Sequence, residues 1–305
     1  MLESEIEKFL QAGRIAAEAR DLGASMIRPG GRMEEVQLAV EDLIRSRGGE
    51  PAFPAQISLD HVAAHDCCPP GDPRLFLPEN VAKLDVGVHV EGYVADTAVT
   101  VDLRDGPDSP LAAAAREALE AAIALARPGV PVGKLGGAVE KAITARGFRP
   151  VVNLTGHGVA RFQIHCSPQV PNYKENSRVT LRAGQAVAIE PFASTGKGWV
   201  HDRGEPQVFQ LKRRPKAKDR LPLALERFLL SLHGFPFARR DLVRAVGAGG
   251  VEEALGLLRE RKILVEYPPL AEDPGARVSQ MEHTLLILED RVVVTTDPDR
   301  EPIRL

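Results

Sequence analysis

The chain has 305 residues, of which 44% are hydrophobic and 27% are charged. This composition is that of a globular protein with a sizeable core, so dominant disorder is excluded. A formal net charge of −3 argues against a general binder of polyanions. No stretch approaches ~18 consecutive apolar residues, and the acidic N-terminal residues lack a signal-peptide core. We therefore expect a cytoplasmic protein without membrane spans.

In chain order, two pairs of helices alternate with two strand-rich stretches. Apolar residues at helical spacing, closed by Gly and Pro, predict helices over 3–27, 33–47, 110–127 and 134–146. Strands are expected at 84–90, 93–101, 185–193 and 283–296.

The stretch from about 200 to 275 differs from the rest of the chain in its residue pattern. Six of the nine residues in 212–220 are Lys or Arg. Three short helical patterns follow, over 222–232, 239–246 and 251–261. We interpret the stretch as a small helical insert between two strands of the core. The simplest interpretation of the basic run is a solvated loop; contact with ribosomal RNA is the sharper alternative.

The two helix pairs are related by an internal repeat. Arg28-Pro29-Gly30 aligns with Arg127-Pro128-Gly129 at an offset of 99 residues, and Arg47-Gly48 aligns with Arg146-Gly147 at the same offset. One residue further, His65 aligns with His165. Identities at one fixed offset indicate a duplication of about 100 residues. A pseudo-symmetric fold with a site between its halves follows as a hypothesis.

Two aspartates interrupt a predicted hairpin. If Glu91-Gly92 forms its turn, Asp96 lies opposite Gly87, and Asp85 shares that face because side chains alternate along a strand. The two carboxylates are then diagonal neighbours, with Cα atoms roughly 7–8 Å apart, and Gly87 leaves room between them. They would converge on a metal ion, unless the hairpin is simply an acidic face turned to water.

Three further residues complete a candidate metal centre. Glu190 ends one predicted strand, Glu282 begins another, and His157 lies between two glycines, where a close backbone approach is expected. Together with Asp85 and Asp96 they supply four carboxylates, whose charge two divalent cations would cancel. Oxygen-rich ligands with one imidazole suit manganese, iron(II) or cobalt, with zinc as a further candidate. Two such ions favour hydrolysis of an amide or ester.

The motifs around these residues resemble a known family, the type II methionine aminopeptidases of peptidase family M24 in their short archaeal-like form. The matching segments are Asp85-Val86-Gly87, Ala95-Asp96-Thr97, Gly156-His157-Gly158, Ile189-Glu190-Pro191 and Glu282-His283-Thr284. The resemblance implies an α+β, pseudo-symmetric pita-bread fold with a small winged-helix-like insert. The catalytic domain would comprise 1–200 and 273–305, and the insert 201–272.

The resemblance also implies an activity: removal of the N-terminal methionine from nascent proteins whose second residue is small. A hydroxide activated by two divalent ions (Co, Mn, Fe(II) or Zn) would attack the peptide carbonyl.

Residue by residue, Asp85 would chelate one ion, Asp96 and Glu282 would bridge both, and His157 and Glu190 would bind the other. Glu190 would also move a proton.

His65 and His165 would contact the substrate, with His165 beside the scissile carbonyl and His65 near the scissile nitrogen. After His65 the family usually has Tyr-Thr-Pro, whereas this chain has Asp66-Cys67-Cys68. The remaining cysteine, Cys166, follows His165, but no triad pattern surrounds it, so a cysteine nucleophile is the weaker hypothesis.

Two alternatives stay open. One is a peptidase similar to prolidase or aminopeptidase P, although those usually carry a large N-terminal domain. The other is a non-catalytic relative that binds RNA or protein. The expected partners are N-terminal peptides of nascent proteins, with the ribosome as a further candidate. We expect no membrane, no specific nucleic acid and a monomer.

Overall fold

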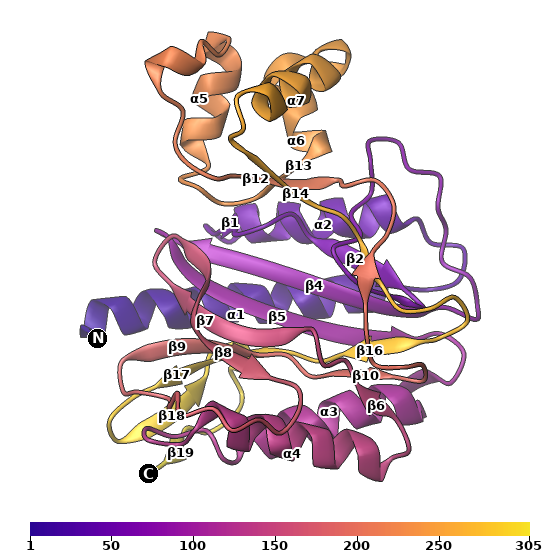
Figure 1. The fold of residues 1–305 in the computed structure, drawn as a ribbon, viewed down its shortest axis with the longest axis vertical. Coiled ribbons are helices and arrows are strands. Elements are labelled where there is room, and N and C mark those ends of the chain that lie inside the picture. Colours follow the sequence, from indigo (N-terminus) through magenta and orange to yellow (C-terminus); the bar gives the residue numbers. More distant parts are fainter.

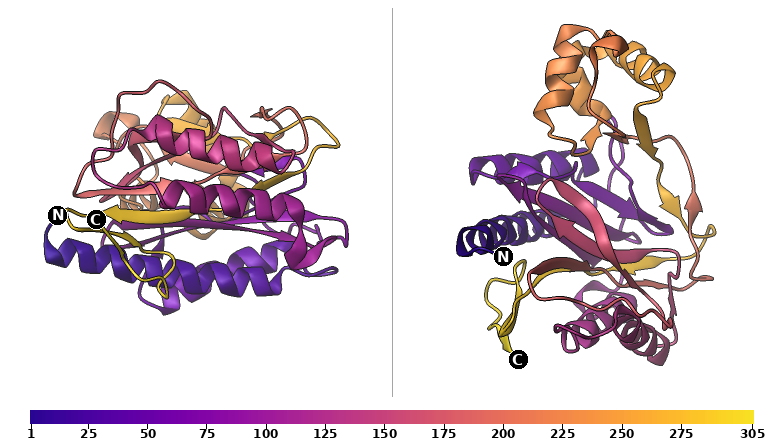
Figure 2. Two further views of the ribbon diagram at one scale, coloured as in Figure 1. Left: turned by 90° about the horizontal axis from the view of Figure 1, so that it is seen from below. Right: turned by 60° about the vertical axis from the view of Figure 1, so that its left-hand side comes forward.

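The computed structural model describes residues 1–305, with two helix pairs packed on antiparallel sheets and a third helical group standing apart (Figure 1). The first pair is α1 (Glu3–Met26) and α2 (Met33–Ser46), and the second is α3 (Pro110–Ile123) and α4 (Val132–Ala145). Figure 2 shows the strands lying between the two pairs. All four predicted helices are confirmed to within about a turn. No helix has both the length and the apolar composition needed to cross a membrane.

The first helix pair covers a sheet built around one long hairpin. Its strands are β1 (Glu50–Pro51), β2 (Gln56–Leu59), β4 (Val81–Val90) and β5 (Tyr93–Asp102), with β4 central and paired to the other three. Apolar side chains of α1, α2 and β4, among them Ile15, Val40 and Leu84, form a buried core between helices and sheet.

The second helix pair covers a six-stranded sheet in the order β19-β18-β17-β9-β7-β8. These strands are β7 (Thr155–Ala160), β8 (Gln163–Pro171), β9 (Gln185–Ile189), β17 (His283–Ile287), β18 (Arg291–Val294) and β19 (Ile303–Arg304). A smaller sheet joins β6 (Arg149–Pro150), β10 (Phe192–Ser194) and β16 (Val278–Gln280). The core between the second helix pair and these strands is separate from the first core and contains Leu119, Val139 and Leu285.

Two of the predicted strands are each divided in the structure. The stretch 283–296 is a hairpin of β17 and β18, because the exposed Glu289 and Asp290 form its turn. The stretch 185–193 ends as β9 at Ile189 and continues as β10 from Phe192, in a different sheet. Glu190 therefore lies at a break between two strands, which frees its side chain from either sheet.

The internal repeat is confirmed in three dimensions. Glu18 of α1 pairs with Arg47 after α2, and Glu117 of α3 pairs with Arg146 after α4. Both partners are displaced by the same 99 residues that relate the sequence motifs. The glycines of the repeated Arg-Pro-Gly motifs also share a left-handed backbone, with φ values of 82° and 84°. The two halves thus keep the same helix contact as well as the same turns.

The insert has a core of its own at the top of Figure 1. It contains three helices, α5 (Leu223–Ser231), α6 (Arg239–Val246) and α7 (Val251–Glu260), as the sequence predicts. A three-stranded sheet accompanies them, formed by β12 (Val208–Leu211), β13 (Phe237–Ala238) and β14 (Leu264–Tyr267). At the base of the insert, β11 (His201–Asp202) pairs with β15 (Leu270–Ala271), which pairs with β3 (Val62–Ala64) of the core.

One buried ion pair fastens the insert to the first half. Arg240 of α6 is only 6% exposed and pairs with Glu41 of α2. The same guanidinium donates to Gln37 Oε1 at 3.3 Å and to the sulfur of Cys67 at 2.8 Å. Because Cys67 is two residues from His65, the insert contacts the loop that carries this histidine.

Candidate active site

The hairpin of β4 and β5 has the predicted register. Gly87 lies opposite Asp96 and Asp85 lies opposite Ala98, so both aspartates project from the same face. The expectation for Gly87 is wrong in one respect. A Cβ atom there would come within 2.2 Å of the ring of Phe53, so the missing side chain makes room for that ring and not for a gap between carboxylates.

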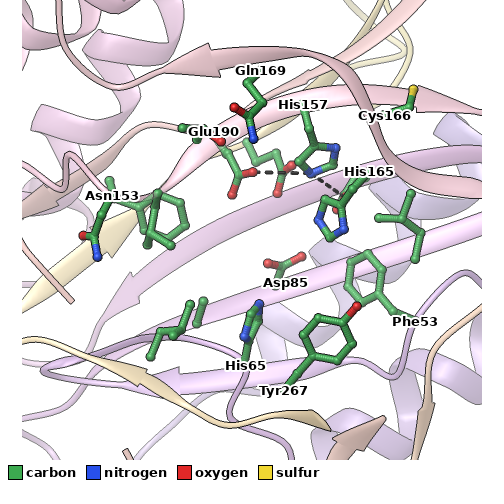
Figure 3. Close-up of a pocket in the computed structure, with 18 of the residues that line it drawn as sticks. Phe53, His65, Asp85, Asn153, His157, His165, Cys166, Gln169, Glu190 and Tyr267 are labelled. Carbon is green, nitrogen blue, oxygen red and sulfur yellow. Dashed lines mark ion pairs between the residues drawn. The ribbon is translucent and has the colours of Figure 1, made fainter. Parts of the chain in front are cut away.

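The second half contributes the remaining three candidate ligands. His157 belongs to β7, Glu190 follows β9 and Glu282 precedes β17. The Nε2 atom of His157 lies 3.4 Å from Glu190 Oε1 and 3.7 Å from Asp96 Oδ2 (Figure 3). Ligand atoms of Asp96, His157 and Glu282 all lie within 4.8 Å of one another. The structure thus brings all five predicted residues to the floor of one cleft.

The glycines beside His157 have the expected role. A Cβ atom on Gly156 would lie 2.5 Å from the carbonyl oxygen of Ala188, and one on Gly158 would lie 2.4 Å from that of Ser167. Both contacts are with neighbouring backbone, which moves less easily than a side chain. The flanking glycines therefore let β7 pack tightly between β8 and β9, and this packing fixes the imidazole.

Burial perturbs every titratable group of the cluster. It raises the pKa of Asp85 to about 6, and it raises the pKa values of Asp96, Glu190 and Glu282 well above their usual range, with repulsion from the neighbouring carboxylates adding to the effect on these three. Burial also lowers the pKa of His157 to about 3, helped by the nearby His165. Four largely buried carboxylates at one place repel one another and are poorly solvated, so the cluster favours the binding of cations.

Several carboxylate oxygens of the cluster lack hydrogen-bond partners, as expected for atoms that bind a metal ion. Asp85 Oδ1, Asp96 Oδ1 and Glu282 Oε1 are buried and have no hydrogen-bond partner. Buried polar atoms in folded proteins are nearly always paired, so three unpaired carboxylate oxygens at one place indicate free ligand positions. Oxygen ligands with one imidazole nitrogen suit divalent ions such as manganese, iron(II), cobalt and zinc.

Sequence reasoning missed Gln280, which supports two of these carboxylates. Its Nε2 atom donates to Asp85 Oδ2 at 3.2 Å and lies 3.5 Å from Glu282 Oε2. Gln280 is fully buried, so its amide cannot turn away to solvent. Its position two residues before Glu282 was the available signal, because residues at that spacing usually share a face of an extended chain.

The cluster forms part of a cleft of about 740 Å³. Figure 3 shows the rings of His65 and His165 directed into the space over Asp85. The ring centroid of His165 lies 4.3 Å from that of His157, and the centroid of His65 lies 5.6 Å from that of Tyr267. Apolar side chains also line the cleft, from the core and from the insert: Phe53, Ile164, Phe192, Val208, Tyr267 and Leu270.

An unusual backbone conformation presents His65. Its φ angle is 66°, a left-handed value that is costly for residues with a Cβ. The N–H of His65 donates to Gln56 Oε1 at 3.0 Å, which holds this conformation. Burial lowers the pKa of His65 to about 4 and also lowers the pKa of His165, so both rings are neutral near pH 7. Each can then offer an N–H to a substrate.

The other histidines and the cysteines take no part in the cluster. His89 stacks on Phe235 of the insert with ring centroids 4.5 Å apart, and His283 contacts Thr296 Oγ1 at 2.8 Å. Cys166 borders the cleft, but Figure 3 shows its thiol turned away from the rings of His157 and His165. Burial raises the pKa of Cys166, which keeps it a thiol and argues against a nucleophile.

Known proteins share this fold and sequence over nearly the whole chain. The model of metallopeptidase family M24 matches residues 7–249. The methionine aminopeptidase of Archaeoglobus fulgidus is 42% identical over 291 residues, which cover 95% of this chain and 98% of that protein.

Solved structures show the fold as well. The methionine aminopeptidase of Thermotoga maritima has a TM-score of 0.70 at 24% identity and covers 97% of this chain and 98% of its own. The prolidase of Pyrococcus furiosus has a TM-score of 0.60 at 20% identity; the match covers 98% of this chain but 65% of the prolidase. The M24 match and the 42% identity to a methionine aminopeptidase over nearly its full length show the family: the chain belongs to metallopeptidase family M24 and, within it, to the methionine aminopeptidases.

Proposed function

We propose that the enzyme uses two divalent ions to remove the N-terminal methionine of nascent proteins whose second residue is small. The observation that carries this proposal is the set of three unpaired carboxylate oxygens beside the His157 imidazole on the floor of the cleft. Asp85 would chelate one ion, Asp96 and Glu282 would bridge both, and His157 and Glu190 would bind the other. Two divalent ions held by these residues would provide a water nucleophile of lowered pKa and would polarise the scissile carbonyl.

The side chains around the cluster supply the remaining steps. Glu190, whose pKa is raised by burial and neighbouring carboxylates, accepts the proton that the attacking water loses and passes it toward the departing amine. The neutral His165 ring donates a hydrogen bond to the carbonyl oxygen as negative charge develops there. His65, across the space over Asp85, contacts the scissile nitrogen. The apolar wall that includes Phe53 and Tyr267 receives the methionine side chain.

A peptide panel tests the activity and its specificity. Met-Ala-Ser, Met-Lys-Ser, Leu-Ala-Ser and Ala-Pro-Ser are each incubated with the protein after chelation and after addition of Mn, Fe(II), Co or Zn. We expect methionine release from Met-Ala-Ser alone, lost on chelation and restored by metal. Cleavage of Ala-Pro-Ser would instead support a prolidase-like or aminopeptidase P-like enzyme. Full activity in metal-free protein would contradict the proposed centre.

We propose the cytoplasm as the compartment, a monomer as the working state and the nascent chain as the substrate. Association with the ribosome is a further proposal, supported by the basic run 212–220. Arg213 of this run is neutralised by Asp219 at 2.7 Å, but five basic side chains remain exposed: Lys212, Arg214, Lys216, Lys218 and Arg220. Co-sedimentation with ribosomes, compared between the wild type and a variant with these five residues changed to Gln, tests it. Equal sedimentation of the two proteins would leave the run a solvated loop.

We also propose that 201–272 is an insert whose removal spares the metal centre, because no proposed ligand lies inside it. Removing the insert also removes Arg240, the buried ion-pair partner of Glu41, so the charge of Glu41 has to be removed as well. The suitable variant therefore joins residue 200 to 273 and carries Glu41→Gln. We expect it to bind metal in calorimetric titration and to turn over Met-Ala-Ser poorly, since Val208 and Tyr267 of the insert line the cleft. A folded variant that binds no metal would contradict the ligand assignment.

A further inference from the structure

The two bridging candidates, Asp96 and Glu282, lie where the sheets of the two halves meet. β5 carries Asp96, and Glu282 stands directly before β17 of the other sheet. Glu282 and Ala98 form an isolated bridge, with the N–H of Glu282 donating to Ala98 O at 3.0 Å. Threonine hydroxyls extend this junction. Thr97 Oγ1 donates to Glu282 O at 2.8 Å, and Thr284 Oγ1 contacts both the N and O atoms of Asp96 at 2.8 Å.

A guanidinium from the N-terminal helix reaches both sides of this junction. Arg20 of α1 has a side chain only 14% exposed. Its NH1 group donates to Thr97 Oγ1 at 3.0 Å and to Thr296 O at 3.1 Å. Thr296 in turn accepts the N–H of Thr284 on its Oγ1 at 3.2 Å. The other guanidinium nitrogens pair with Asp21, which is exposed and serves only as a counter-ion.

We propose that Arg20 is a positioning residue of the active site, which fixes the separation of Asp96 and Glu282 by tying Thr97 to Thr296. The proposal rests on the proposed ligand assignment. Through Thr97, Arg20 is one hydrogen bond from the backbone of Glu282. Through Thr296 it is linked to Thr284, whose hydroxyl bonds the backbone of Asp96. Two ions that share ligands must lie ~3.5–4 Å apart, so a small shift of one strand against the other changes how both carboxylates reach them. Groups outside the ligand set commonly tune metal affinity in this way.

The two hydrogen bonds from Arg20 NH1 require the planar guanidinium group of arginine. One nitrogen donates to Thr97 Oγ1 of β5 and to Thr296 O in the turn after β18, while the other guanidinium nitrogens stay paired with Asp21. Lysine would keep the charge but lacks the fixed fork that orients these donors. We therefore expect a charge-conserving replacement to recover only part of the function, whereas a purely electrostatic effect on the carboxylates would be recovered in full.

The test compares Arg20→Met with Arg14→Met as a matched control, because Arg14 is exposed on the same helix. Mn(II) and Co(II) affinities are measured by calorimetric titration, and the visible absorption of the Co(II)-loaded protein reports ligand geometry. We expect Arg20→Met to weaken at least one ion on the order of 10-fold or more and to alter the Co(II) spectrum. The kcat for Met-Ala-Ser should fall with little change in KM. Arg14→Met should match the wild type in all three measurements.

Two more variants keep the test decisive. Thr97→Val removes the hydroxyl that links Arg20 to Glu282 O while keeping the side-chain shape, so it should weaken metal binding even if Arg20→Met fails to fold. Asp96→Asn should lose an ion outright if the ligand assignment is correct. If Asp96→Asn loses an ion while Arg20→Met and Thr97→Val keep wild-type affinities and spectra, the role of Arg20 is structural and the proposal fails. If Asp96→Asn keeps both ions, the ligand assignment fails.

Discussion

The two halves of the core have the same framework but contribute differently to the centre. Both keep a helix pair, a left-handed turn glycine and a Glu–Arg contact at equivalent positions. The first half supplies Asp85 and Asp96 from one hairpin, whereas the second supplies His157 from β7 and two glutamates that flank the ends of β9 and β17. The difference teaches that the duplicated features hold helices and turns, while the candidate metal ligands lie where the copies have diverged.

The largest effect is expected from changing His157, because only the second half provides an imidazole ligand. His157→Ala removes a nitrogen within 4 Å of two carboxylates and should weaken metal at one site and lower activity together. Titration calorimetry beside steady-state kinetics on Met-Ala-Ser measures both quantities. Retention of two ions at wild-type affinity would show that the imidazole is not a ligand.

The repeat-related pair His65 and His165 should behave differently from His157. His165→Ala leaves the carboxylate and imidazole set whole, so metal stoichiometry should persist while kcat falls on the order of 10²–10³, typical for the loss of one oxyanion donor. His65→Ala should lower kcat less, because we place His65 at the scissile nitrogen. Loss of metal from the His165 variant would mean that its ring, 4.3 Å from that of His157, takes part in ligation.

Replacing a glycine near the ligands should destabilise the protein more in the second half than in the first. Gly158→Ala places a Cβ atom against the backbone of Ser167, whereas Gly87→Ala meets the side chain of Phe53, which can move. We expect thermal unfolding to show a larger loss for Gly158→Ala, at least the ~1–3 kcal/mol typical of overpacking, and a smaller one for Gly87→Ala. The reverse order would mean that β7 and β8 separate more easily than Phe53 turns.

The smallest effect on stability is expected from breaking the Glu–Arg ion pair that the two halves share. Glu18→Gln and Glu117→Gln each break one helix ion pair, and all four partner side chains are at least one-third exposed. Water and salt screen such pairs, so each change should lower the unfolding temperature only slightly and by similar amounts. Metal affinity should not change. A loss of metal in either variant would show that the helix contact is coupled to the centre.

Local patterns in the sequence were sufficient for the helices, the hairpin register and the candidate ligands. The register follows from Glu91-Gly92, because a two-residue turn fixes which residues face one another. The divided strand at 283–296 was missed because apolar residues continue past Glu289 and Asp290, whose charges mark the turn. These two adjacent exposed charges are the sequence signal for the break.

Contacts between distant segments could not be predicted in the same way. The strands β12 and β13 are short, and β13 is only two residues long, so neither shows a usable alternation. The contact between Arg20 and Thr97 joins residues 77 positions apart, and no periodicity of α1 marks this arginine among its other charges. The space over Gly87 was misassigned for the same reason, because Phe53 arrives from another segment.

The buried pair of Arg240 and Glu41 has an evolutionary consequence. Removing one partner of a buried pair typically costs about 3–5 kcal/mol, comparable to a large part of a domain's stability. Without Arg240, the buried Glu41 would keep only the partly exposed Arg45, 3.4 Å away, as an ion-pair partner. A lineage that gained or lost the insert would therefore have had to change position 41 at nearly the same time. We expect descendants of the two-half core without an insert to carry a neutral residue there, and an alignment of such sequences would show positions 41 and 240 changing together.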